Sequence, residues 1–145
     1  MVIPVRDEEQ TVAAAIASAL AQERAPALEV IVADGDSSDG TRAAVSQIAH
    51  DDPRVRLIGN PEGKTPNGLN LAIQAARGDV IVRCDAHSVL PARYVATALD
   101  VMTRTGADVV GGTMRAVGSS YRQRAIAMAL TTPVGVGDAR FHTGG

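Results

Sequence analysis

The sequence predicts an α/β fold in which helices flank a mostly parallel β-sheet. Short apolar runs typical of buried strands alternate with stretches whose apolar residues recur at helical spacing. Such alternation implies right-handed crossovers between parallel strands. Of the residues, 46% are hydrophobic and only 2% are aromatic, so Ala, Val, Ile and Leu must build the core.

The first strand and helix follow from a clear apolar pattern. Residues 2–5 form an apolar run that predicts a buried strand. Asp7 is expected to cap the next helix, with Gln10 at the capping-box position. Apolar residues at every fourth position from Val12 to Leu20 give that helix one apolar face.

The second strand and helix surround a loop of turn residues. Residues 29–33 are apolar after Glu29 and predict a strand. Residues 34–40 are Asp, Gly and Ser, which favour turns and helix caps. A helix is expected over residues 41–49, because Ala44 and Ile48 share its apolar face.

The third and fourth strands enclose a further helix. Residues 54–58 alternate between polar and apolar side chains, which indicates a strand near the edge of the sheet. After a loop over 59–66, a helix is expected over 67–77, with Gly78 as its C-terminal stop. The apolar residues 80–82 predict the fourth strand.

The last third of the chain begins with a clear pattern that then weakens. A helix is expected over 91–105, burying Val95, Leu99 and Met102, and a fifth strand over 107–114. A helix over about 121–130 and a Gly-rich tail over 133–145 complete the prediction.

Composition excludes several classes of protein. A net charge of −2 gives no electrostatic footprint for nucleic acid. No stretch approaches the roughly 20 apolar residues of a membrane span, and no signal-peptide pattern opens the chain. A single cysteine, Cys84, favours cytoplasmic chemistry and is expected to pack in the core.

Acidic residues follow successive predicted strands. Glu8 follows the first strand, Asp34 the second and Asp85 the fourth. If the strand order is 3-2-1-4, these ends meet in one crevice, where ligands bind in open parallel sheets. Carboxylates there could contact a base, a ribose or a metal. For Asp36 and Asp39 a turn or cap role is the favoured explanation, whereas for Asp34 the two explanations are about equal.

The sequence Asp85-Ala86-His87 is the strongest candidate for a metal site. Carboxylate oxygen suits Mg²⁺ or Mn²⁺, and Mn²⁺ also accepts imidazole. The alternative is a strand-end aspartate and a helix-capping histidine. Lys64 and Arg83 could offset phosphate charge or lie on the solvated surface.

Three familiar nucleotide and metal motifs do not fit. The first strand lacks a following G-x-G-x-x-G motif. Residues 59–65 resemble a P-loop, but three residues separate the glycines where four are required. Residues 34–45 begin like a calcium loop, yet Asp39 replaces its glycine and Val45 its glutamate.

Several motifs together resemble a known family. They are VIPVRDEE at 2–9, EVIVADGDSSDGT at 29–41, GDVIVRCDAH at 78–87, and Asn60, Gly63, Gly68, Leu69, Asn70 and Ala72. In order and spacing these resemble the inverting family 2 glycosyltransferases with the GT-A fold, a Rossmann-like sheet that binds nucleotide-sugars. The Asp-Ala-His variant and the tail over 135–141 are similar to succinoglycan-type exopolysaccharide glycosyltransferases.

The resemblance implies roles for individual residues. Pro4 and Glu8 would line the nucleotide pocket, Asp34 would bind the base, usually uracil, and Lys64 would assist. The usual Asp-Asp-Gly-Ser loop is here Asp34-Gly35-Asp36-Ser37. Asp36 is therefore an open candidate for nucleoside binding.

The resemblance also implies the metal chemistry. Asp85 would contact the ribose or a Mg²⁺ or Mn²⁺ ion, and His87 would replace the second aspartate of the motif. The metal would bridge the phosphates and stabilise the leaving diphosphate. The catalytic base is expected beyond Gly145, in the acceptor half.

Residues 1–145 are thus expected to be a partial family 2 domain, with the donor-binding half over 1–115 and weaker signals over 116–145. The donor is expected to be a nucleoside-diphosphate sugar, with a UDP-sugar favoured, and the acceptor a saccharide or lipid-linked chain. The alternatives are a nucleotide-sugar-binding module without catalysis and a nucleotidyltransferase. The expected location is cytoplasmic, at the inner membrane face only through a longer protein.

Overall fold

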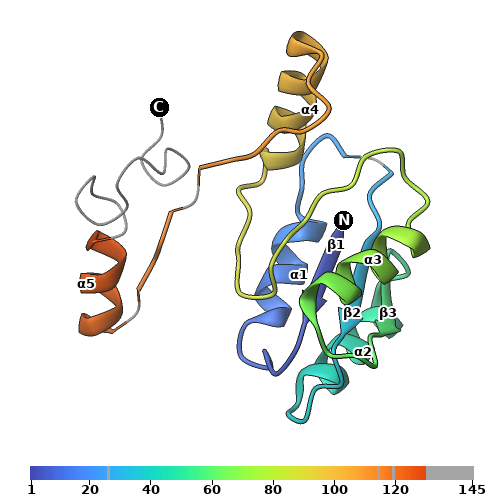
Figure 1. Ribbon diagram of the computed structural model, residues 1–145, viewed down its shortest axis with the longest axis vertical. Coiled ribbons are helices and arrows are strands. Elements are labelled where there is room, and N and C mark those ends of the chain that lie inside the picture. Colours follow the sequence, from blue (N-terminus) through green and yellow to red (C-terminus); the bar gives the residue numbers. More distant parts are fainter. Residues whose placement is uncertain (26, 114, 119, 130–145) are drawn as a thin grey trace. The chain divides into compact units, whose positions relative to one another are not determined.

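The computed structural model describes residues 1–25, 27–113, 115–118 and 120–129 (Figure 1). The chain divides into two compact units, Met1–Thr97 and Ala98–Gly145. The first, called the sheet unit below, contains the β-sheet and the candidate site.

The sheet has three parallel strands. They are β1 (Val2–Val5), β2 (Val30–Asp34) and β3 (Val55–Gly59), in the order β1-β2-β3. Every residue of β2 is buried, as expected for a central strand of a parallel sheet. The first three predicted strands, their order and the edge position of the third are confirmed.

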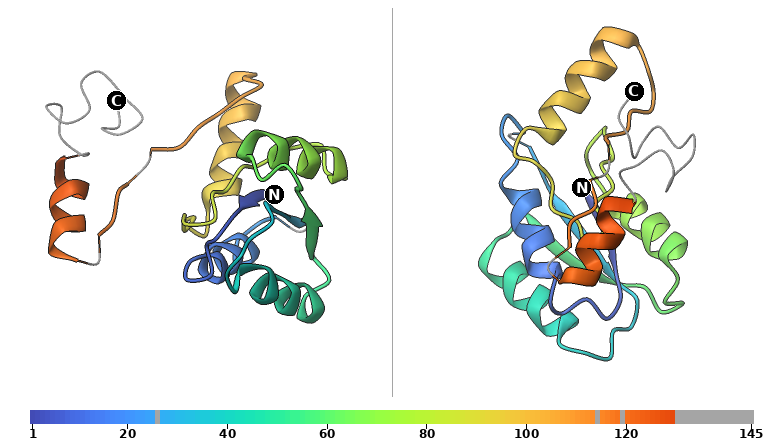
Figure 2. Two further views of the ribbon diagram at one scale, coloured as in Figure 1. Left: turned by 60° about the horizontal axis from the view of Figure 1, so that its bottom comes forward. Right: turned by 90° about the vertical axis from the view of Figure 1, so that its left-hand side faces the viewer.

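Helices cover both faces of this sheet. Helices α1 (Val12–Leu20) and α2 (Thr41–Asp51) lie together on one face, and α3 (Thr65–Ala75) covers the other (Figure 2). Successive strand residues point to opposite faces, so the apolar runs supply both layers. The predicted α/β sheet flanked by helices is confirmed.

The core beneath α3 shows this alternation. Val2, Ile31 and Ala33 pack with Ala72 of α3 in one buried cluster. The intervening residues of β2, Val30 and Val32, are equally buried and face the α1–α2 side. Only small and branched aliphatic side chains fill these layers, as the composition predicts.

The fourth strand was predicted wrongly. Residues 80–82 form no strand, and the segment joins the sheet only by a parallel bridge between Arg83 and Val2. Val2 donates to the carbonyl of Val82 (2.8 Å) and accepts from Cys84 N (3.1 Å). The chain then turns away, with Ser88 N bonded to the Asp85 carbonyl, so the overlap with β1 is too short for a ladder.

The predicted cap of the first helix is also wrong. Helix α1 begins at Val12 with Thr11 as N-cap, and no side chain caps it. Asp7 has φ 53° and accepts instead from Ser38 N at 2.7 Å. The main chain of Glu8 supplies the missing acceptor, because its carbonyl accepts from Val12 N. Ser38, which binds the Asp7 side chain, lies in the loop after β2, so the local spacing around Asp7 could not reveal it.

The remaining helices are α4 (Tyr94–Thr105) and α5 (Tyr121–Ala129). Val95 is buried, whereas Leu99 and Met102 are only partly buried. Helix α4 ends before Gly106, whose positive φ of 67° fits the predicted stop.

The predicted fifth strand is absent from the described residues 107–113. These residues form no hydrogen-bonded ladder in the described part of the chain, so their apolar pattern had no sheet to join. Met114, the end of the last predicted helix and the tail over 133–145 lie outside the described residues. In the described part of the chain, every helix is too short or too polar to cross a lipid bilayer.

Candidate functional site

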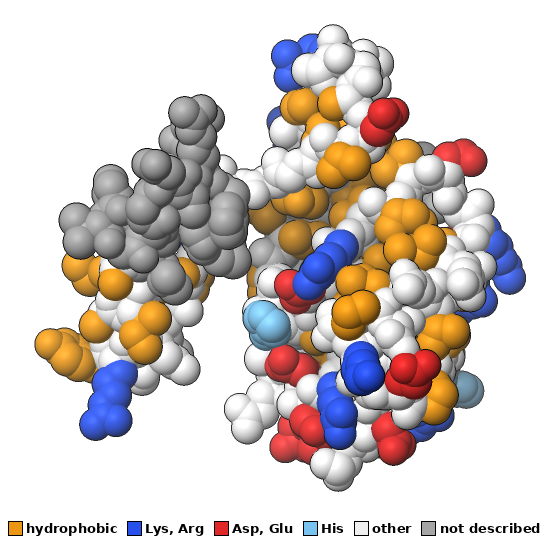
Figure 3. All heavy atoms as spheres, in the orientation of Figure 1, with side chains coloured by type: hydrophobic (Ala, Val, Ile, Leu, Met, Phe, Trp, Pro, Cys, Tyr) orange, Lys and Arg blue, Asp and Glu red, His pale blue; other side chains and the backbone are white. Residues whose placement is uncertain are grey.

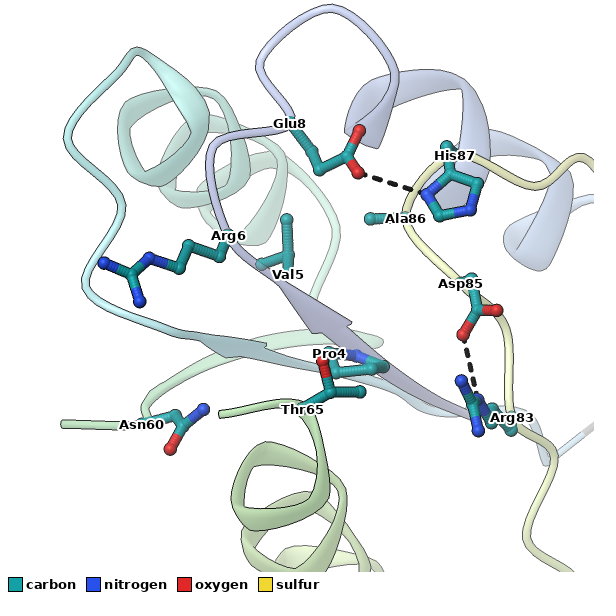
Figure 4. Close-up of a pocket in the computed structure, with 10 residues that line it drawn as sticks. All are labelled: Pro4, Val5, Arg6, Glu8, Asn60, Thr65, Arg83, Asp85, Ala86 and His87. Atoms are coloured by element: carbon teal, nitrogen blue, oxygen red, sulfur yellow. Dashed lines mark hydrogen bonds and ion pairs between the residues drawn. The ribbon is translucent and has the colours of Figure 1, made fainter. Parts of the chain in front are cut away.

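A cavity of about 200 Å³ lies at the carboxyl ends of the strands in the sheet unit. The ends of β1 and β3 and the segment over 83–87 form its walls (Figure 4). Its lining residues are Pro4, Val5, Arg6, Glu8, Asn60, Thr65, Arg83, Asp85, Ala86 and His87. This is the edge of an open parallel sheet at which ligands bind.

Four of the predicted site residues line this cavity. Pro4 and Glu8 come from β1 and the loop after it, and Asp85 and His87 come from the segment beside β1. The short bridge at Arg83 aligns that segment with β1 even though no strand forms. The structure therefore brings together residues about 80 positions apart in the sequence.

The side chains of Glu8 and His87 point toward one another and are in contact (Figure 4). His87 Nδ1 lies 3.1 Å from Glu8 Oε1, and Thr11 Oγ1 donates to the other carboxylate oxygen of Glu8 at 2.6 Å. Both oxygens of Glu8 are thus engaged, which fixes its orientation. With hydrogen on Nδ1, the imidazole leaves Nε2 as a free electron-pair donor.

The loop that carries Glu8 is bonded to the loop after β2. Glu8 N donates to Thr41 Oγ1 (2.7 Å), and Glu9 N donates to Asp39 Oδ2 (3.1 Å). In the opposite direction, Gly40 N donates to Glu9 Oε2 (2.8 Å). The Thr41 hydroxyl is the main cause that lowers the pKa of Asp39 below its ordinary value. Asp39 therefore acts as a turn and cap residue.

Asp34 does not line the cavity. Its side chain is fully buried, with Oδ2 2.9 Å from Arg42 Nη1 and Oδ1 3.4 Å from Ser37 N. Arg42 lies in the first turn of α2, directly above the end of β2. Both oxygens therefore have protein partners.

Asp36 and Lys64 also lie outside the cavity lining. Asp36 is exposed, with φ 60°. Lys64 is exposed at the N-terminal end of α3, where its carbonyl accepts from Asn60 Nδ2 at 3.0 Å. The main chain of Lys64 thus orients a cavity residue, while its ammonium group does not reach the lining.

Asn60 presents an unpaired acceptor. Its side chain is 3% exposed, and among the described residues Oδ1 has no hydrogen-bond partner. A buried acceptor left unpaired costs about 1–3 kcal/mol. Asn60 lines the cavity, although Oδ1 itself is closed off from solvent.

Two glycines let Arg6 lie against the cavity wall. A Cβ added at Gly63 would come within 2.7 Å of Arg6 Nη1, and one added at Gly35 within 3.3 Å of Arg6 Cβ. Gly63 also has a positive φ of 66°. The loops after β2 and β3 therefore approach β1 more closely than side chains would permit.

Comparison with known proteins decides the family. Residues 1–140 match Glycosyl transferase family 2. The chain belongs to this family. The succinoglycan biosynthesis protein ExoA of Rhizobium meliloti (strain 1021) is 37% identical over 117 residues, which are 79% of this chain and 36% of ExoA.

Two further similar proteins extend the comparison. The UDP-Glc:alpha-D-GlcNAc-diphosphoundecaprenol beta-1,3-glucosyltransferase WfgD of Escherichia coli is 30% identical over 113 residues, 77% of this chain and 44% of WfgD. The mannosyltransferase PcManGT from Pyrobaculum calidifontis, solved with GDP-Man and Mn²⁺, matches with a TM-score of 0.68 at 26% identity, covering 88% of this chain and 38% of that one.

The chain spans less than half the length of these three similar proteins. The predicted family, its GT-A fold and the likeness to succinoglycan-type proteins are confirmed.

The residues of the cavity suit a divalent cation that arrives with a diphosphate. Asp85 offers carboxylate oxygen and His87 imidazole, a donor set that suits Mn²⁺. Metal-bound histidines usually donate their other ring N–H to a carboxylate, as His87 can to Glu8. No group of three metal-binding side chains occurs in the described ranges, so phosphate oxygens would have to complete the coordination.

Cys84 takes no part in the lining. It is 2% exposed, and burial together with the charge of Asp85 raises the pKa of its thiol to about 11. The prediction that Cys84 packs in the core is confirmed.

Four polar lining residues were not predicted as site residues. They are Arg6, Asn60, Thr65 and Arg83. Arg6 and Asn60 lie in the motifs that resemble the family, and Arg83 was considered for phosphate without being chosen. Thr65 carried no signal, because it starts α3 and was placed in a loop.

Proposed function

We propose that this chain forms the donor-binding part of a family 2 glycosyltransferase. The enzyme would transfer a sugar, with inversion, from a nucleoside-diphosphate sugar to a saccharide or lipid-linked acceptor. Family membership and the cavity at the carboxyl ends of the strands support this proposal. A UDP-sugar is favoured because WfgD, named as a UDP-Glc transferase, is a relative.

The convergence of Glu8, Asp85 and His87 on one cavity carries the proposal. Asp85 and His87 would hold Mg²⁺ or Mn²⁺, and Glu8 would orient His87. When bound, the metal would stabilise negative charge on the leaving diphosphate. Pro4 would form the wall against which the nucleotide lies.

The nucleoside contacts are assigned from burial and pairing. Asn60 would form part of the wall against the nucleoside, because it lines the cavity. Asp34 would contribute to base binding when Arg42 releases one of its oxygens. Asp36 and Lys64 would act from the rim, because both are exposed.

The acceptor and the location are proposed from the relatives. ExoA is named for succinoglycan biosynthesis, and WfgD is named for transfer to a diphosphoundecaprenol-linked sugar. We therefore propose a growing polysaccharide or lipid-linked saccharide as acceptor. The free thiol of Cys84 agrees with a cytoplasmic site of action.

Calorimetry of UDP in the presence of Mn²⁺ tests the donor site. Wild type should bind UDP, and Asp85→Ala should bind it at least about tenfold more weakly, since a charged ligand contact is lost. Asp52→Ala is the matched control, because Asp52 pairs with an arginine two residues away at the other end of the sheet. Failure of wild type to bind UDP or GDP would refute the proposal.

A nucleotide-sugar-binding module without catalysis is the second candidate. Both carboxylates that line the cavity are already paired, Glu8 with His87 and Asp85 with Arg83, so we assign the catalytic base to neither. Hydrolysis of UDP-glucose, or its transfer to a saccharide, would favour the enzyme. Binding without turnover by this chain would favour the module. Membership of family 2 argues against a nucleotidyltransferase.

A further inference from the structure

Arg83 shares its carboxylate partner with the proposed metal. Arg83 Nε lies 2.9 Å from Asp85 Oδ1, and both side chains line the cavity (Figure 4). A divalent cation bound at Asp85 would add two positive charges beside the guanidinium. Metal binding at Asp85 would therefore repel Arg83 and weaken its ion pair with Oδ1.

The side chain of Arg83 can move while its backbone stays in place. The parallel bridge to Val2 fixes its main chain beside β1. The side chains of Arg83 and Asp85 are 57% and 39% exposed, so water can replace their mutual contact. Among the described residues Asp85 is the sole polar partner of the guanidinium, and its two terminal nitrogens are unpaired.

The charges around the cavity leave a diphosphate in need of cations. Arg6 and Arg83 balance Glu8 and Asp85 in the lining, so their formal charges sum to zero. Acidic and basic side chains are likewise interspersed on the face of the sheet unit in Figure 3. No surplus of positive charge is therefore present in this lining before a divalent cation binds.

We propose that Arg83 is a diphosphate ligand, and that Asp85 holds it at the cavity wall until nucleotide and metal bind. With a metal held by Asp85, the guanidinium would be free to form paired hydrogen bonds with phosphate oxygens, which its planar fork suits. The inference rests on the proposed donor site and adds a residue and an exchange of partners to it. It follows that Arg83 favours UDP binding and opposes metal binding in the absence of nucleotide.

Arg83→Gln tests this exchange through binding alone. With Mn²⁺ present, UDP affinity should fall by about tenfold to a hundredfold, the range for a lost charge-assisted hydrogen bond. With EDTA present, where Asp85 still holds Arg83, the loss of UDP affinity should be smaller. Uridine has no phosphate, so its affinity should stay within about twofold. The affinity of the nucleotide-free chain for Mn²⁺ should rise by up to about sixteenfold, as expected for removing a unit charge about 5 Å from a divalent ion in water.

Arg54→Gln is the matched control. Arg54 is similarly exposed and pairs with Asp52, also two residues away, but it precedes β3 at the opposite end of the sheet. All three affinities should match wild type in this variant. A change equal to that of Arg83→Gln would show a general charge effect and would overturn the proposal.

In Arg83→Gln the affinity for UDP should fall while the affinity for Mn²⁺ rises. These opposite changes distinguish a phosphate ligand from a structural residue. Unchanged UDP affinity in Arg83→Gln, or parallel loss of UDP, uridine and Mn²⁺ binding, would overturn the proposal. Failure of wild type itself to bind any nucleoside diphosphate would instead refute the donor site on which the inference rests.

Discussion

Thr41 is the position where stability and site geometry are most directly linked. Its side chain is fully buried, and Oγ1 accepts from Glu8 N at 2.7 Å. Thr41→Val keeps the volume but leaves that N–H without its acceptor. The free energy of unfolding should fall by about 1–3 kcal/mol, the cost of an unsatisfied buried donor. Urea denaturation followed by circular dichroism measures this change.

The same substitution should be visible at Asp39. The Thr41 hydroxyl is the largest cause of the lowered pKa of this carboxyl, so the pKa should rise toward its ordinary value in Thr41→Val. An NMR titration of Asp39 measures it, and Thr41→Ser is the control because it retains the hydroxyl. A loss below about 0.5 kcal/mol, less than a typical net hydrogen bond, would refute the reasoning, as would an unchanged pKa of Asp39.

Three further predictions concern other parts of the sheet unit. Gly63→Ala should lower the free energy of unfolding by about 1–2 kcal/mol in urea denaturation, because of its left-handed backbone; a variant as stable as wild type would contradict this. The Arg77 backbone N–H holds the pKa of Glu29 below its ordinary value of 4.5. The stabilisation from Glu29 is therefore present above that value and is lost as the pH falls through the lower folded pKa. In acid denaturation, Glu29→Gln should lose less free energy of unfolding over this pH range than wild type does. Identical acid profiles of the two proteins would argue against the contact. Cys84, with a pKa of about 11, should react with iodoacetamide at pH 8 far more slowly in the folded chain than in urea, as measured by mass spectrometry; equal rates would contradict its burial.

The sequence was sufficient to predict the elements whose patterns are local. The apolar run over 2–5 and the helix starting at Thr41 lie where they were expected. The strand order was assumed, and the observed order β1-β2-β3 agrees with that assumption. These features depend on side-chain periodicity, which is present in any short window of the chain.

Features that depend on distant partners were not predictable in the same way. Residues 80–82 have the composition of a buried strand, yet Val80 and Ile81 are 42% and 39% exposed because the contact with β1 ends after one bridge. Asp7 has the spacing of a helix cap but bonds to Ser38, 31 residues away.

The site shows the same division. The strand topology predicts that Glu8 lies near His87. The pairing of Asp85 with Arg83 instead depends on which rotamers the cavity walls allow. The burial of Asp34 against Arg42 likewise depends on how α2 starts, which the spacing of residues in the sequence does not specify.

The bonds between the loops after β1 and β2 have a thermodynamic consequence for ligand binding. Since Glu8, Glu9 and Gly40 are already bonded across these loops, their backbone entropy is lost during folding. Ordering one residue costs about 1–2 kcal/mol, so a nucleotide that found these loops mobile would bind correspondingly more weakly. Substitutions at Asp39 or Thr41, which need not touch the ligand, should therefore weaken binding mainly through an unfavourable entropy.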